Sequence, residues 1–175
     1  MNFSTNSRIL ARGPADDLLS AAAEVAAGRL DAAEDIERAI ATANAPACRH
    51  AFVRRFDAMA RATAAAVDAQ RTVGAPVPPL AGLAVSVKDL FDVAGVPSTA
   101  ASKSMADAAP ATADSPVVAR LRAAGAALLG HTNLTEFAFS GIGINPHHGT
   151  PANAGTLALD ATPRIPGGST SGGAV

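Results

Sequence analysis

The stretch LAGLAVSV, residues 80–87, is a short apolar run rich in valine and bounded by turn signals, which predicts a strand. The run AALLG, residues 126–130, predicts a second strand, which is buried. Between them, Asp114 and Pro116 are typical of a helix start, Leu121 falls on its apolar face, and Gly125 is suited to its end. The order strand, helix, strand predicts an α/β layered sheet rather than a helical bundle.

The first part of the chain, residues 1–79, is predicted to be helical and to pack on this sheet. Apolar residues recur at helical spacing before a terminating glycine, an acidic pair suggests a capping box before the next helix, and an alanine-rich helix follows. The residues behind these three predictions are Leu18, Leu19, Ala22, Val25 and Gly28; Asp31, Glu34, Ile36 and Ile40; and 57–70. The linker-like break at 74–79 divides this region from a core formed by residues 80–175.

Composition restricts the function further. Hydrophobic residues make up 49% and charged residues 17%, which is typical of a folded chain. The net charge of −1 provides no electrostatic basis for binding nucleic acid or an anionic membrane. The single cysteine, Cys48, cannot form an internal disulfide, and residues 1–17 contain no apolar signal segment. We therefore expect a soluble, cytoplasmic protein.

Lys88 ends the first predicted strand, and its position admits two interpretations. A lysine at a strand end is commonly a surface residue whose amine reaches water. The alternative is a buried lysine that acts as a base. Its pKa would then lie roughly three units below the free value of about 10.4, a penalty of about 4 kcal/mol on the charged form.

The final residues, RIPGGSTSGGAV (164–175), have the composition of a flexible tail, but they can also form an active-site loop. They are not a phosphate-binding loop, because no Gly-Lys-Ser/Thr follows, and no serine has the spacing of a hydrolase nucleophile elbow. The histidines do not support a metal site, since His147 and His148 are adjacent while His50 and His131 stand alone.

Five ordered blocks carry a resemblance to a known family. They are GLAVSVKD (82–89), DVAGVP (92–97), GHTNLTEF (130–137), NP (145–146) and RIPGGSTSG (164–172). In this order they resemble the amidase signature family, serine hydrolases of linear amides that include the A subunit of the glutaminyl-tRNA-forming amidotransferase. The resemblance implies a layered α/β/α fold with a mixed central sheet, a small-molecule amide substrate, and neither cofactor nor metal.

Residue by residue, the resemblance implies a Ser–cis-Ser–Lys triad. Lys88 matches its base, and Ser169 matches the middle serine, which follows a cis peptide from Gly168. Gly167, Thr170 and Ser171 line the same loop, and Thr170 stands where the family usually has serine. Lys88 would take a proton from Ser169, and Ser169 from the nucleophile. With this resemblance, the final stretch is predicted to be an active-site loop.

The resemblance also implies that part of the site is missing. The family's nucleophilic serine and oxyanion hole lie roughly two dozen residues beyond the middle serine. We therefore expect these 175 residues to be an inactive N-terminal fragment without a nucleophile. We further expect the Gly168–Ser169 linkage to relax to a trans peptide or to become disordered from Gly167 onward.

Other matched residues receive secondary roles. Asn133, Glu136 and Phe137 are predicted to be structural, whereas His147, His148 and Asn153 are candidates for a substrate entrance. Two alternatives to an independent amidase remain open: a non-catalytic binding module, or the A subunit of the amidotransferase. Residues 145–164 are longer and less charged than expected for the latter. We expect no membrane and no direct nucleic-acid partner, with a homodimer as the candidate assembly.

Overall fold

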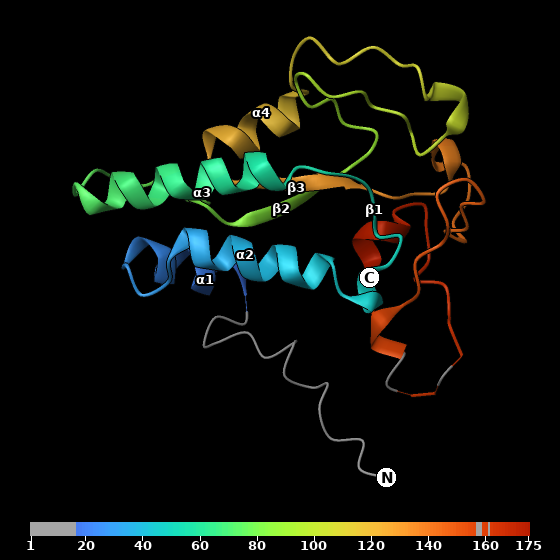
Figure 1. The fold of residues 1–175 in the computed structure, drawn as a ribbon, viewed down its shortest axis with the longest axis horizontal. Coiled ribbons are helices and arrows are strands. Elements are labelled where there is room, and N and C mark those ends of the chain that lie inside the picture. The colour runs from blue at the N-terminus through green and yellow to red at the C-terminus, as the bar shows by residue number, and fades with distance from the viewer. Residues whose placement is uncertain (1–16, 157–158, 161) are drawn as a thin grey trace.

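The computed structural model describes residues 17–156, 159–160 and 162–175; the N-terminal stretch in which no signal segment is expected lies outside them, apart from Asp17. The helices and strands follow the order α1, α2, β1, α3, β2, α4, β3 (Figure 1). Their bounds are Leu18–Ala26, Ala32–Ala43, Phe52–Arg55, Asp57–Thr72, Ala84–Lys88, Pro116–Ala123 and Ala127–Thr132. No helix among the described residues combines the length and apolar character that crossing a bilayer requires.

The three strands form a mixed sheet in the order β1, β3, β2. β2 and β3 run parallel, and Lys88 lies opposite Thr132. β1 pairs antiparallel with β3, and every residue of β3 is buried. The fold class predicted from the sequence, α/β with a mixed sheet, is confirmed.

Helices cover both faces of this sheet. Apolar side chains of α1, α2 and α3 pack around Leu83, Ala127 and Leu129 on one face. Val118 of α4 packs with Val87 and Leu128 on the other face. Figure 1 shows α4 on one side of the strands and α1 and α2 on the opposite side. This arrangement leaves the carboxyl ends of β2 and β3 side by side and joined to long loops.

The strand β1 was not predicted. It has only four residues, two of them arginines, and its partner β3 lies more than seventy residues further along the chain. The segment 1–79 therefore contributes a strand to the sheet as well as helices. The division at residue 79 into two regions stays a prediction.

Two local details of the helices differ from the sequence analysis. Ala21 and Val25 form the buried face of α1, whereas Leu18 and Leu19 are 53% and 82% exposed. Asp31 precedes α2 as predicted, but its side chain does not cap the helix. The backbone N–H groups of Ala32 and Ala33 donate instead to Asp68 of α3, while Asp31 pairs with Arg71. The capping-box prediction was wrong because α3 supplies both partners.

Candidate active site

Lys88 is the last residue of β2. Val87, directly before it, points into the core, and the alternation of side chains along a strand turns Lys88 toward the opposite side. Its backbone lies opposite Thr132 at the end of β3. The carboxyl ends of parallel strands are a common place for ligand sites in α/β proteins.

The amine of Lys88 contacts two hydroxyl groups from the final loop. Lys88 Nζ lies 2.7 Å from Ser169 Oγ and 2.8 Å from Thr170 Oγ1. Burial lowers the pKa of Lys88 from its ordinary value, and no carboxylate among the described residues counteracts that effect. Ser169 and Thr170 follow Lys88 by 81 and 82 positions in the chain. The fold thus brings their hydroxyl groups to an amine whose pKa is lowered by burial.

Backbone contacts hold the loop around Ser169. Gly168 N donates to Gly141 O at 2.8 Å, and Thr135 N donates to Ser169 O at 3.0 Å. A Cβ atom on Gly168 would lie 2.6 Å from Gly143 N, so this close approach requires glycine. Gly167 has φ of 93°, which also favours glycine.

The Gly168–Ser169 peptide is cis, and the loop from Gly167 to Val175 is part of the described structure. The expectation of a trans linkage or a disordered end was therefore wrong. The physical reason is that residues 135–143 already supply neighbours and hydrogen bonds on both sides of the linkage.

Ser171 occupies a different place from Ser169 and Thr170. It is fully buried at the start of a short turn, Ser171–Ala174, and its Oγ has no hydrogen-bond partner among the described residues. The next residue, Gly172, donates its N–H to Asn133 O at 2.8 Å. Ser169 and Thr170 therefore contact the Lys88 amine, whereas no hydrogen bond among the described residues joins Ser171 to it.

Asp89 and His131 were not singled out from the sequence as site residues, although Asp89 follows Lys88 in the chain and His131 lies opposite Val87 on the neighbouring strand. The Asp89 carboxylate accepts hydrogen bonds from Thr99 N at 3.1 Å, from Ala101 N at 2.9 Å and from Thr99 Oγ1. His131 Nδ1 lies 3.0 Å from Asp89 Oδ1, and both side chains are buried. Burial alone would raise the pKa of Asp89, but its contacts with His131, Thr99 and Ala101 outweigh burial and lower it. In the sequence, the signal for these buried contacts of Asp89 is its position next to Lys88.

Three further residues of the block 130–137, namely Asn133, Glu136 and Phe137, were predicted to be structural. Asn133 Nδ2 donates to His50 O at 3.0 Å and to Gly149 O at 2.8 Å. Glu136 accepts a hydrogen bond from Ser102, which lowers the pKa of its carboxyl group, whereas Phe137 is partly exposed.

The three residues predicted to lie near a substrate entrance make different contacts. His148 lines a cavity of about 200 Å³, together with Asp89 and Ser102 among other residues, and burial lowers its pKa. His147 lies 3.3 Å from Glu136, and the backbone N–H of Asn153 donates to Arg164 O. Their role at an entrance stays a prediction. Within the described ranges, no group of three or more His, Cys, Asp or Glu residues is placed to hold a metal ion.

Most of the chain is similar to known amide-cleaving proteins. A protein-family model described as Amidase matches residues 34–175. AtzE, which is a subunit of the 1-carboxybiuret hydrolase of Pseudomonas sp. (strain ADP), is 44% identical over 149 residues, which are 85% of this chain and 32% of that protein. The A subunit of the glutamyl-tRNA(Gln) amidotransferase of Salinispora arenicola (strain CNS-205) is 39% identical over 155 residues, 89% of this chain and 28% of that protein.

Solved structures agree with these sequence matches. A structure described as a vestigial protein complex that reveals the evolutionary origins of an s-triazine catabolic enzyme superposes with a TM-score of 0.81 at 41% identity. The match covers 89% of this chain and 33% of the other. The chain thus spans about a third of the length of the relatives it matches.

Proposed function

The chain belongs to the amidase family, and on that premise we propose that Lys88 and Ser169 are the base and the proton relay of an amide-hydrolysing site. The substrate class is a small, linear, non-peptide amide, and the reaction passes through an acyl-enzyme. The observation that carries this proposal is the Lys88 amine, which burial shifts toward its neutral form and which lies within hydrogen-bond distance of Ser169 and Thr170.

The proposed chemistry begins with proton transfer. A neutral Lys88 amine donates one N–H to Thr170 Oγ1 and keeps its lone pair for the proton of Ser169 Oγ. Ser169 Oγ in turn takes the proton of an attacking serine hydroxyl. The bond from that oxygen to the carbonyl carbon forms, and the C–N bond breaks. The proton returns through Ser169 to the leaving amine, and water then releases the acid.

The experiment that tests this proposal uses the full-length gene product. Incubation with simple aryl amides should release the amine and the acid. Addition of hydroxylamine should divert the acyl group into a hydroxamate, because hydroxylamine competes with water for an acyl-enzyme. Amine release without hydroxamate would contradict the acyl-enzyme, and the absence of amine release would contradict the proposed activity.

A second candidate function is that of the A subunit of a tRNA-dependent amidotransferase. The observation in its favour is the identity of 39% to such a protein over most of this chain. That function predicts ammonia release from glutamine that depends on partner subunits, whereas the main proposal predicts hydrolysis of small amides by the protein alone. A non-catalytic binding module would retain the amide and release no product.

The cytoplasm is the proposed compartment, and a homodimer is the proposed assembly. The support for the compartment is the single cysteine in a chain of 175 residues. Cell fractionation of the native protein tests the compartment, and its mass in solution tests the assembly.

A further inference from the structure

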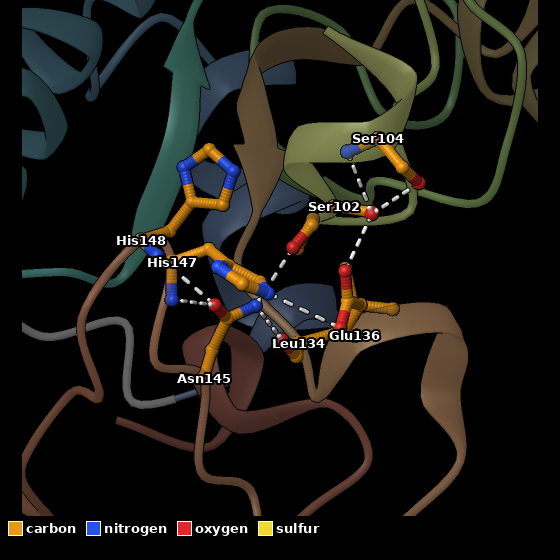
Figure 2. Close-up of polar contacts among 8 residues, drawn as sticks. Ser102, Ser104, Leu134, Glu136, Asn145, His147 and His148 are labelled. Atoms are coloured by element: carbon orange, nitrogen blue, oxygen red, sulfur yellow. Dashed lines mark hydrogen bonds and ion pairs between the residues drawn. The ribbon is translucent and has the colours of Figure 1, made fainter.

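Asn145 is a buried polar residue outside the Lys88–Ser169–Thr170 cluster, and all of its side-chain hydrogen-bonding capacity is used. The side chain is 1% exposed. Nδ2 donates to Leu134 O at 2.8 Å and to Ala101 O at 2.9 Å. Oδ1 accepts from the backbone N–H groups of His147 at 2.8 Å and His148 at 3.0 Å (Figure 2). An amide provides two donor hydrogens and two acceptor lone pairs, so no other side chain of this size could replace it.

The first of these bonds leads directly to Ser169. Leu134 O and Thr135 N are the two ends of one planar peptide group. Asn145 binds the carbonyl end, and the N–H end donates to Ser169 O at 3.0 Å. The orientation of this peptide therefore depends on both contacts, and each hydrogen bond polarises the other.

The second bond leads toward Lys88. Asn145 holds the carbonyl of Ala101, whose N–H donates to the carboxylate of Asp89 at 2.9 Å. Ala100 N also donates to Asp89 O at 3.0 Å, and Asp89 directly follows Lys88. Asn145 thus connects the segment behind Lys88 with the segment that holds Ser169.

Both segments contain non-glycine residues in the left-handed region. Ala100 and Ala101 have φ of 51° and 47°, and Phe137 and Ala138 have φ of 51° and 59°. Such conformations persist only where surrounding contacts enforce them. Phe137 N donates to Ala100 O at 3.1 Å, and Ser102 donates to Glu136, as Figure 2 shows for the second pair. Asn145 adds a buried connection between the two segments, because its side chain binds Ala101 O in one and Leu134 O in the other.

We propose that Asn145 is a positioning residue that sets Ser169 against Lys88. The inference rests on the proposed amidase function, and it adds a residue whose side chain makes no hydrogen bond to Lys88 or Ser169. Loss of Asn145 should let the Leu134–Thr135 peptide turn and displace Ser169. A displacement of about 1 Å at a reacting group can cost roughly a hundredfold in rate.

The test is steady-state kinetics of the full-length gene product on a simple aryl amide. Asn145→Ala should lower kcat about a hundredfold and leave KM within about threefold, because the altered contact serves the reacting groups rather than substrate binding. Asn44→Ala is the matched control, since Asn44 lies outside the site and accepts one hydrogen bond from Arg55. Val25→Ala controls for lost stability, because Val25 is buried among the helices. Both controls should retain kcat below their melting temperatures.

A kcat unchanged in Asn145→Ala, or a fall that Val25→Ala reproduces at equal loss of stability, overturns the inference. If Asn145→Ala does not fold, Asn145→Asp decides, because it keeps the oxygen facing His147 and His148 and removes the amide donors. A lower kcat at constant KM in this variant supports the inference, and an unchanged kcat overturns it. Failure of both variants to fold also overturns it, since Asn145 would then serve folding itself. A wild-type protein without amide hydrolysis would instead contradict the proposed function.

Discussion

The helical layer of α1, α2 and α3 is packed by apolar side chains, whereas the loops around Lys88 are held by buried polar groups. Val25, Ile36 and Ile40 bring the helical layer together with small alanines and use no directional contact. All eight buried polar or charged residues found in the described ranges lie after residue 88: Asp89, Ser102, His131, Thr132, Asn133, Thr135, Asn145 and Ser171. The loops that form the second region are residues 89–102, 133–150 and 167–172.

The two kinds of packing should respond differently to substitution. Apolar packing depends on volume, so a similar side chain can replace another at modest cost. A hydrogen bond depends on one atom, and its loss leaves a buried partner unsatisfied. We therefore expect substitutions in the helical layer to change stability and substitutions near Lys88 to change activity.

The largest effect is expected for Lys88→Ala in the full-length gene product. Removal of the base should lower kcat on an aryl amide by about a thousandfold or more, with little change in melting temperature. Lys103→Ala is the control, because this lysine is exposed and has no contact with Ser169 or Thr170. Retention of activity by Lys88→Ala would remove the basis of the proposed chemistry.

Ser169→Ala should have the next largest effect. It breaks the proton relay between Lys88 and the nucleophile, and kcat should fall about a hundredfold or more. Thr170→Ser keeps the hydroxyl that lies 2.8 Å from Lys88 Nζ, so its kcat should stay within about threefold of wild type. Equal losses in the two variants would show that the middle serine has been wrongly assigned.

The pH dependence of the rate tests the state of Lys88. Burial lowers the pKa of this amine, and the neutral form is the one that accepts a proton. Activity should be present above that lowered pKa and fall up to about tenfold per pH unit below it, with the midpoint beneath the free value of about 10.4. The acid limb of kcat is the measurement, and His148→Ala serves as the control because the pKa of His148 is also lowered. If the acid limb of kcat disappears in His148→Ala, the limb reports the titration of His148 and the prediction for Lys88 is wrong.

The smallest effect is expected in the helical layer. Ile36→Val removes one buried methylene group and should lower the free energy of unfolding by about 1 kcal/mol, with kcat unchanged. Leu19→Ala is the matched control, because Leu19 is 82% exposed and its truncation should change stability by less than about 0.5 kcal/mol. Urea unfolding measures both variants. A loss of kcat in Ile36→Val would show that the two regions are coupled.

Local patterns in the sequence were sufficient for the α/β fold class and for two of the three strands. The runs at 80–87 and 126–130 predicted β2 and β3, because short segments rich in valine and leucine and bounded by turn signals favour strands. The order of five motif blocks indicated the amidase family. Lys88 and Ser169 could be named as candidates because each lies within one of these blocks.

The tertiary structure alone decided which distant groups meet. It placed the short strand β1 beside β3, gave the cap of α2 to Asp68, and turned Leu18 and Leu19 toward solvent. It also joined Asp89 to 99–101 and Asn145 to Ala101 and Leu134. The periodicity of apolar residues predicts only local structure, within a few positions along the chain. These contacts connect residues 10 to 80 positions apart. Their geometry arises only when the sheet and its loops are packed together.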